Sequence, residues 1–371
     1  MSDIQPIVMP KWGLAMIEGT VVEWQAEVGG AVKAGEDIME IETAKITNVY
    51  ESPVSGTLRR IVVAAGETVP VGALLGVCAP ASVSDDEVEA YVKDFIDNFD
   101  WDAAAGASGP ATETVEAGGR RARFLKQGDA EGTPVLLIHG FGGDCLSWLF
   151  NQEALAEGHT TYALDLPGHG GSEKDVGSGT LEVMVQAVLD FMAAKGIEKA
   201  HLVGHSMGGA VALALAKDHA GKVASATLLA PAGLGAEINM EFINGYIEQK
   251  RAKKLRGVLE ALVADPGMIT NDMVEEVLKY KRLDGAQEAL GKMRDGLFAG
   301  GSQAATFSSG DLAGVSVPLL AIWGEEDRIL PVAHAAALPD QVKVVRLPAT
   351  GHLPHMEKAG EVNEAILAFI D

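Results

Sequence analysis

The residues around Ser206 have the types and spacing that nucleophilic catalysis needs. Ser206 is the centre of Gly204-His205-Ser206-Met207-Gly208, which follows an apolar segment and precedes a helical one. Small residues on both sides of a serine suit a sharp turn that pushes the hydroxyl outward. A serine hydroxyl alone is a weak nucleophile, so it needs a base, and the base needs an acid to orient it.

The acid and the base are expected after the serine, in that order along the chain. Asp327 follows another apolar segment, and His352 lies near the C-terminus. Glu325 and Glu326 are rivals for the acid. Three other histidines are rivals for the base: His139, His205 and His355. Two of these rivals, His139 and His205, are more typical of a pocket lining than of a base.

These segments resemble the α/β-hydrolase family. Residues 139–143, His-Gly-Phe-Gly-Gly, resemble its oxyanion loop, and residues 165–172, Asp-Leu-Pro-Gly-His-Gly-Gly-Ser, are a further marker that we interpret as structural. The resemblance implies that the backbone N–H groups of Phe141 and Met207 bind the developing oxyanion. The family spacing also favours Asp327 as the acid.

The elements that must position these residues alternate between apolar strands and amphipathic helices. We expect buried strands at 134–138, 201–204, 223–229 and 319–323, and helices at 181–195 and 209–218. Strands that are apolar on both faces indicate a mostly parallel sheet covered by helices. The predicted catalytic domain is therefore residues 119–371, an α/β-hydrolase fold with a helical cap at about 232–310.

The predicted cap holds ten of the 29 basic residues of the chain. These are Lys250, Arg251, Lys253, Lys254, Arg256, Lys279, Lys281, Arg282, Lys292 and Arg294. The cluster has two interpretations: it is a solvated helix face, or it receives an acceptor that carries phosphate.

The first 80 residues predict a small all-β domain with an internal repeat. Gly19-Thr20, Gly29, Val32 and Gly35 recur 37 residues later as Gly56-Thr57, Gly66, Val69 and Gly72. Candidate strands lie at 7–9, 19–24, 37–41, 56–63 and 73–78. A repeat of this length predicts two similar four-stranded sheets packed as a flattened barrel.

Lys45 lies between the two halves of this repeat, in Glu42-Thr43-Ala44-Lys45-Ile46. If a twofold relates the halves, the lysine stands at an exposed hairpin tip. Residues 4–79 resemble the lipoyl domains of 2-oxo-acid dehydrogenase complexes, which implies that Lys45 carries a covalent lipoyl group. Biotin-carrying domains share the fold but flank their lysine with methionines. Ala44 departs from the acidic residue that most lipoyl domains have there, and an unmodified surface lysine is the remaining alternative.

Residues 81–118 predict an acidic helix and a flexible linker. Ser84-Asp85-Asp86-Glu87 matches a capping box. Apolar residues then follow at helical spacing: Val88, Tyr91, Val92, Phe95, Ile96 and Phe99. This stripe packs against its own chain or symmetry mates, or it docks on a partner subunit. The segment 103–111, rich in Ala, Gly and Ser, is typical of a tether for a swinging arm.

Composition limits the classes of function. The net charge of −23 argues against binding nucleic acid or an anionic membrane surface. The two cysteines, Cys78 and Cys145, are too few and too far apart for a disulfide framework. There is no signal peptide at the N-terminus and no apolar stretch of membrane-spanning length, so we expect a cytoplasmic protein without a metal site.

The whole chain resembles the dihydrolipoamide acetyltransferase components of bacterial acetoin dehydrogenase (acetoin-cleaving) complexes. That resemblance implies transfer of an acetyl group from S-acetyldihydrolipoyl-lysine to coenzyme A by Ser206, Asp327 and His352. It also implies a thiamine-diphosphate-dependent acetoin dehydrogenase component and a dihydrolipoamide dehydrogenase as partners, and a homo-oligomer.

Several alternatives stay open. The acetyl group passes through an acyl-serine, or the thiol attacks directly with help from His352. A serine hydrolase acting on esters or thioesters, with an attached lipoyl carrier, is the rival activity. The rival without catalysis is a lipoyl carrier on an inactive scaffold.

Overall fold

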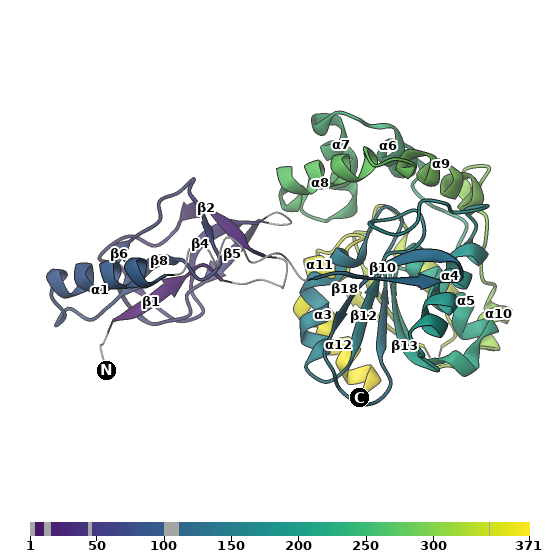
Figure 1. Ribbon diagram of the computed structural model, residues 1–371, viewed down its shortest axis with the longest axis horizontal. Coiled ribbons are helices and arrows are strands. Elements are labelled where there is room, and N and C mark those ends of the chain that lie inside the picture. The colour runs from purple at the N-terminus through teal and green to yellow at the C-terminus, as the bar shows by residue number, and fades with distance from the viewer. Residues whose placement is uncertain (1–3, 11–15, 44–46, 100–110, 341) are drawn as a thin grey trace. The chain divides into compact units, whose positions relative to one another are not determined.

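The structure is a computed structural model that describes residues 4–10, 16–43, 47–99, 111–340 and 342–371 (Figure 1). These residues form two compact units. The first comprises residues up to 110 together with 267–273, and the second comprises 111–266 and 274–371. Each unit is described by itself.

The first unit contains two four-stranded sheets. One has the order β1 (Gln5–Val8), β8 (Leu74–Cys78), β6 (Gly56–Ile61) and β3 (Ala31–Val32). The other has the order β5 (Thr47–Glu51), β4 (Asp37–Glu42), β2 (Glu18–Trp24) and β7 (Thr68–Pro70). Fully buried apolar side chains from both sheets form a common core: Ile7, Val21, Ile38, Ile41, Leu58 and Leu75.

The internal repeat predicted from the sequence is confirmed by matched turns in the two halves. Gly29 and Gly66 both have φ of 88°, a left-handed conformation that favours glycine. The Gly29 N–H donates to the Leu58 carbonyl at 2.7 Å, and the Gly66 N–H donates to the Val21 carbonyl at 2.7 Å. Each partner pair is related by the same offset of 37 residues, so the two halves fold alike.

Helix α1 (Asp85–Asn98) packs on the first unit. The predicted capping box is present: Ser84 Oγ accepts from the Glu87 N–H at 3.3 Å, and Glu87 Oε2 accepts from the Ser84 N–H at 2.9 Å. Val88 and Val92 are buried against β8, and Arg59 pairs with Asp85 at 2.6 Å. The part of the apolar stripe that contains Val88 and Val92 is therefore covered by its own chain, whereas Ile96 is exposed. The predicted tether at 103–111 falls almost wholly outside the described residues.

The second unit is built on an eight-stranded sheet with the order β18-β17-β14-β13-β11-β12-β10-β9. Its strands are β9 (Glu113–Ala117), β10 (Arg120–Gln127), β11 (Val135–Ile138), β12 (Thr161–Leu164), β13 (Ala200–His205), β14 (Val223–Leu229), β17 (Leu319–Gly324) and β18 (Lys343–Leu347). The six strands from β18 to β12 run parallel, and β10 and β9 add antiparallel pairs at one edge. This is the mostly parallel sheet that the sequence predicted.

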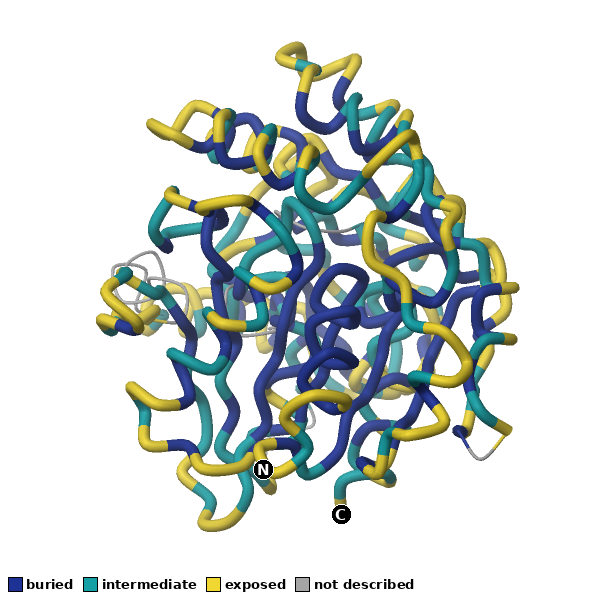
Figure 2. Tube along the Cα trace, turned by 90° about the vertical axis from the view of Figure 1, so that its right-hand side faces the viewer, coloured by how far each residue is buried: buried dark blue, intermediate teal, exposed yellow. Residues whose placement is uncertain are grey.

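Helices cover both faces of this sheet. They are α3 (Leu149–Ala156), α4 (Leu181–Ala194), α5 (Met207–Asp218), α11 (Pro354–Glu357) and α12 (Ala359–Ile370). Helices α4 and α5 pack together, as do α3 and α12, and Figure 1 shows the two pairs on opposite faces. Helix α5 is buried from Met207 to Ala216, and it forms the dark centre of Figure 2. Its position fixes the residue that precedes it, Ser206.

The predicted cap is an insertion between β14 and β17. It contains α6 (Met240–Glu248), α7 (Ala252–Leu259), α8 (Asn271–Lys281), α9 (Ala286–Leu297), the short strands β15 (Phe298–Ala299) and β16 (Ser302–Gln303), and α10 (Ser309–Ala313). Short 3-10 segments complete the unit: η1 (Cys145–Trp148), η2 (Ala220–Lys222), η3 (Glu260–Leu262), η4 (Pro266–Met268) and η5 (Val332–Ala337).

Candidate active site

Ser206 occupies a strained turn between strand β13 and helix α5. Its dihedral angles are φ 53° and ψ −114°, which residues with a side chain rarely adopt. The turn is held by its neighbours: the Ser206 N–H donates to the Leu229 carbonyl at 2.9 Å, and the Ala232 N–H donates to the Ser206 carbonyl at 2.9 Å. Strain of this kind persists only where the surrounding structure enforces it, and it is concentrated at functional sites.

Glycines allow the backbone to close around this turn. A Cβ on Gly204 would lie 2.2 Å from the Gly208 carbonyl oxygen, and a Cβ on Gly208 would lie 2.1 Å from the Ile138 carbonyl oxygen. A Cβ on Gly140 would lie 3.1 Å from the Ser206 Cβ. The segment after β11, which resembles an oxyanion loop, therefore runs directly beside Ser206.

Asp327 and His352 are paired and buried. Asp327 Oδ2 lies 2.8 Å from His352 Nδ1, and their side chains are 0% and 3% exposed. The same carboxylate accepts from Trp323 Nε1 at 3.0 Å and from the N–H groups of Ile329 and Leu330 at 2.8 and 2.9 Å. These bonds fix the carboxylate, which then orients the ring so that Nδ1 donates to it. Nε2 is left as the nitrogen that can accept a proton.

The loop that carries His352 lies against the turn at Ser206. His205 Nε2 donates to the His352 carbonyl at 2.7 Å, and the two imidazole centroids are 4.8 Å apart. The His352 N–H donates to the carbonyl of Leu262 in η3, which ties the loop to the cap at 2.7 Å. The structure thus brings Ser206, His352 and Asp327 to one region.

The rival residues lie in different surroundings. Glu325 and Glu326 are exposed, whereas the Asp327 carboxylate is buried beside His352. Burial, together with the neighbouring His355 and His352, lowers the pKa of His205 well below its usual value. Burial and then the charge of His352 lower the pKa of His355 to about 3. Both rings are therefore neutral near pH 7.

His139 has both ring nitrogens engaged with the backbone. Its Nδ1 donates to the Gly140 carbonyl at 2.7 Å, and its Nε2 accepts from the Leu166 N–H at 3.0 Å. Burial lowers its pKa, which keeps the ring neutral as these two bonds require. His139 therefore ties the loop of residues 139–143 to the segment 165–172, and it has no ring nitrogen left to act as a base.

Two residues that the sequence analysis did not single out hold Gly142 from both sides. His169 Nε2 accepts from the Gly142 N–H at 3.0 Å, and the Tyr246 hydroxyl donates to the Gly142 carbonyl at 2.8 Å. Burial and then His139 lower the pKa of His169 well below its usual value, so the ring remains an acceptor. His169 lies within the family marker 165–172, so the sequence offered a signal for it. No sequence pattern indicated Tyr246.

The segment 165–172 is structural, as its interpretation from the sequence proposed. The buried Asp165 forms an ion pair with Arg123, and its carboxylate accepts from the N–H groups of Cys145 and Gly171, each at 2.7 Å. Burial opposes the charge on Arg123, but the hydrogen bond and charge of Asp165 raise the pKa of the guanidinium. Ser172 Oγ donates to the Asp165 carbonyl at 2.8 Å, which closes the loop.

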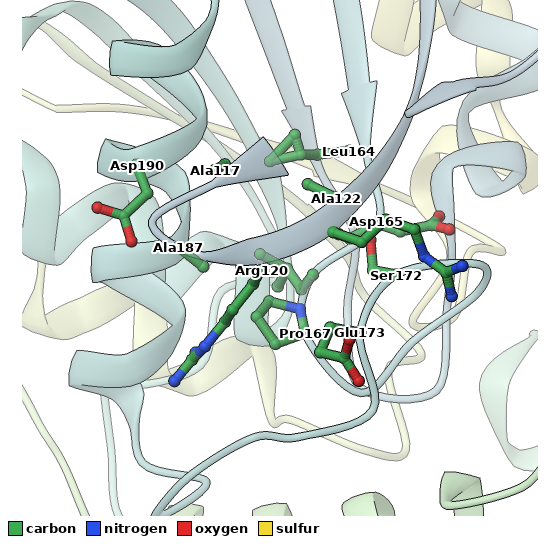
Figure 3. Close-up of a pocket in the computed structure, with 12 residues that line it drawn as sticks. Ala117, Arg120, Ala122, Leu164, Asp165, Pro167, Ser172, Glu173, Ala187 and Asp190 are labelled. Atoms are coloured by element: carbon green, nitrogen blue, oxygen red, sulfur yellow. The ribbon is translucent and has the colours of Figure 1, made fainter. Parts of the chain in front are cut away.

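A surface pocket lies elsewhere in the second unit. It is lined by residues of β10, α4 and the loop 165–173, among them Arg120, Glu173 and Asp190 (Figure 3). None of the residues expected to be catalytic lines it. We therefore do not associate it with the chemistry of Ser206.

In the first unit, the strands on either side of Lys45 pair with each other. Strands β4 and β5 are antiparallel, with Glu42 opposite Thr47. Lys45 itself lies outside the described residues. Lys45 as the lipoyl attachment point stays a prediction from the sequence.

Within the described residues, no cluster of three or more His, Cys, Asp or Glu side chains could hold a metal ion. Among the same residues, every helix is too short or too polar to span a bilayer. Both cysteines are free and buried, and burial raises the pKa of the Cys145 thiol, which argues against a thiolate nucleophile.

Two family models match the chain in the order expected. Residues 5–77 match the biotin-requiring enzyme family, and residues 133–359 match the α/β-hydrolase fold family. A meta-cleavage product hydrolase from Pseudomonas fluorescens has a similar fold, with a TM-score of 0.64 and 24% identity. That similarity covers 69% of this chain and 96% of the hydrolase.

Two curated relatives match both units together. The dihydrolipoyllysine-residue acetyltransferase component of the acetoin cleaving system from Cupriavidus necator is 44% identical, over 97% of this chain and 96% of its own length. The protein of the same name from Pseudomonas putida is 42% identical, over 100% of this chain and 99% of its own length. The chain therefore belongs to the α/β-hydrolase fold family and, over its full length, to the dihydrolipoyllysine-residue acetyltransferase components of acetoin cleaving systems.

Proposed function

We propose that the protein transfers an acetyl group from S-acetyldihydrolipoyl-lysine to the thiol of coenzyme A within an acetoin-cleaving complex. The observation that carries the proposal is the buried Asp327–His352 pair beside the strained Ser206, in a chain that matches acetyltransferase components over its full length. Ser206 is the nucleophile, His352 the general base and acid, and Asp327 the group that orients the imidazole.

In the first half-reaction, His352 Nε2 accepts the Ser206 proton while Oγ bonds to the thioester carbonyl carbon. The C–S bond then breaks, and His352 returns the proton to the departing thiolate. In the second half-reaction, His352 takes the proton of the coenzyme A thiol, the sulfur bonds to the acyl carbon, and Ser206 leaves and regains a proton. Each half-reaction is balanced and needs no oxidant. Direct attack by the thiol, assisted by His352, is the variant without acylation.

We assign the oxyanion site to the backbone N–H groups of Phe141 and Met207. Met207 is the first residue of α5, so its N–H has no partner within the helix, and the helix dipole favours negative charge there. The loop containing Phe141 is fixed by the bonds of Gly142 to His169 and Tyr246. Loss of one such donor costs about 3–4 kcal/mol of barrier.

The proposed carrier is Lys45, in amide linkage to a lipoyl group. When attached, that group would supply a mobile thiol that bears the acetyl group as a thioester. We assign residues 1–80 to the lipoyl domain, 81–118 to the acidic helix and linker, and 119–371 to the catalytic domain. A thiamine-diphosphate-dependent acetoin dehydrogenase component and a dihydrolipoamide dehydrogenase are the proposed partners of a cytoplasmic homo-oligomer.

The second candidate function is hydrolysis of an ester or thioester. It is favoured by similarity to 2-hydroxy-6-oxo-6-phenylhexa-2,4-dienoate hydrolase from Comamonas testosteroni, which is 30% identical over 65% of this chain and 88% of its own length. Product analysis separates the two candidates. With acetyl-dihydrolipoamide and saturating coenzyme A, the transferase produces acetyl-CoA, whereas free acetate as the main product contradicts the proposal.

A further inference from the structure

The turn between α6 and α7 carries the densest positive charge of the cap. From Gln249 to Leu259 the chain has five basic residues and no acidic one, in a protein whose net charge is −23. Lys250, Arg251, Lys253 and Lys254 are all exposed. Within the part of the chain that the structure describes, none of these four forms an ion pair.

Two other lysines of the cap pair with acidic neighbours on their own helices. Lys279 on α8 pairs with Glu276 at 2.6 Å, and Lys292 on α9 pairs with Glu288 at 2.8 Å. These four cations therefore differ from Lys279 and Lys292 in having no acidic partner among the described residues.

A fifth cation lies beneath this turn. Lys281 is 6% exposed, and its Nζ donates to the carbonyl of Tyr246 at 2.5 Å and to that of Gln249. Burial and then the charge of Lys250 lower the pKa of Lys281 to about 8. This mutual repulsion would be relieved by an anion bound at the turn.

Both helices that meet at the turn also reach the candidate active site. In α6, Tyr246 lies four residues before Lys250 and bonds to Gly142 in the oxyanion loop. Helix α7 leads into η3, where the Leu262 carbonyl accepts from the His352 N–H. The eight residues of α7 separate the turn from η3 by about 12 Å.

We infer that residues 250–254, which end the α6–α7 turn and begin helix α7 (Figure 1), bind the phosphate groups of coenzyme A and so direct its thiol toward Ser206 and His352. The inference rests on the proposed function, in which coenzyme A is the acceptor. Exposed lysine and arginine side chains suit this task because they form charge-assisted hydrogen bonds to phosphate. The acidity of the rest of the chain favours approach of the anionic acceptor at this patch rather than elsewhere.

The test compares three acceptors that carry the same pantetheine thiol and differ in the number of phosphate groups. Full-length protein is assayed with free acetyl-dihydrolipoamide as donor and with coenzyme A, 3′-dephospho-coenzyme A or pantetheine as acceptor. We expect Lys253→Gln/Lys254→Gln to raise the KM for coenzyme A about tenfold and to leave the KM and kcat for pantetheine unchanged. The intermediate acceptor should show an intermediate rise. Unchanged pantetheine kinetics also show that the variant folds.

The matched control is Lys279→Gln/Lys292→Gln, which removes two charges from ion pairs on other cap helices. It should leave the KM of all three acceptors unchanged. An unchanged KM for coenzyme A in Lys253→Gln/Lys254→Gln would overturn the inference, as would an equal rise for coenzyme A and pantetheine. If the unsubstituted protein acetylates none of the three thiols, the proposed function itself fails, and that result is distinct from the others.

Discussion

Two matched turns of the first unit and the turn at Ser206 in the second place their glycines in opposite surroundings, and the two units also differ in histidine content. In the first unit, Gly29 and Gly66 serve open turns, with no atom within 4 Å of an added Cβ. In the second unit, an added Cβ on Gly204 or Gly208 would meet backbone. All nine histidines lie in the second unit, and none lies in the first 110 residues. The first unit is a small carrier domain built on a sequence repeat. The second is a catalytic domain whose buried polar side chains are either neutral or paired.

The largest predicted effect is on the rate of acetyl transfer, and it differs between a substitution in the second unit and one in the first. Ser206→Ala should lower the rate of acetyl transfer from free acetyl-dihydrolipoamide by on the order of 10⁵-fold, because it removes the nucleophile. Lys45→Arg should leave that rate unchanged, since the free donor does not need the carrier, but should abolish turnover in the assembled complex. A steady-state assay of both variants with both donors checks the prediction. Loss of the free-donor reaction in Lys45→Arg would show that the division of roles is wrong.

The second prediction concerns the orientation of His352. Asp327→Asn should lower kcat about 10⁴-fold, because the amide no longer holds Nδ1 as the donor nitrogen. The adjacent exposed Glu326 offers a matched control, and Glu326→Gln should leave kcat unchanged. Equal losses in the two variants would exclude a specific role for Asp327.

The third prediction compares the two kinds of glycine. Gly208→Ala should destabilise the second unit by about 3 kcal/mol or more, because the new Cβ meets the Ile138 carbonyl oxygen. Gly66→Ala should cost the first unit only about 1 kcal/mol, from backbone strain at φ 88° without a clash. Calorimetry of the full chain measures both. If Gly66→Ala were the more damaging substitution, the contrast between open and packed turns would be wrong.

The smallest predicted effect is a difference in acid sensitivity. The folded-state pKa of His355 is lowered to about 3, so the unfolded chain, with a pKa of about 6.5, binds more protons at intermediate pH. Its contribution to stability is complete above pH 6.5 and is lost progressively as the pH falls toward 3. At pH 5.5 the loss from this one group is about 1.4 kcal/mol.

The other buried histidines shift in the same direction, since burial also lowers the pKa of His139, His169 and His205. The unfolding temperature of the second unit should therefore fall between pH 7 and 5.5 more than that of the first. His355→Gln should reduce the difference, and calorimetry of the full chain at the two pH values measures it. An equal fall in both units would contradict the account.

Much of this architecture could be predicted because its signals are local. Five consecutive residues, 204–208, are enough to predict the turn at Ser206. Glycines at a fixed offset are enough to predict the repeat in the first unit. The strands β3, β5 and β7 were not predicted. They are two to five residues long, and β5 contains polar residues such as Asn48 and Glu51, so neither length nor alternation identifies them.

The bonds that shape the oxyanion loop could not be predicted from the sequence. His169 and Tyr246 lie 27 and 104 residues from their common partner, Gly142, and only the folded sheet and the cap bring them together. The neutral state of the buried histidines could not be predicted either, because a lowered pKa comes from burial and from neighbours that are distant in sequence.

The proposed passage of the acetyl group through Ser206 is tested most directly by trapping. Full-length protein is mixed with acetyl-dihydrolipoamide labelled in the acetyl group, quenched before coenzyme A is added, and analysed by peptide mass spectrometry. We predict that the label is on Ser206 and that coenzyme A then removes it as labelled acetyl-CoA. Formation of acetyl-CoA without any label on Ser206, or release of the label as acetate in the presence of coenzyme A, would contradict the account.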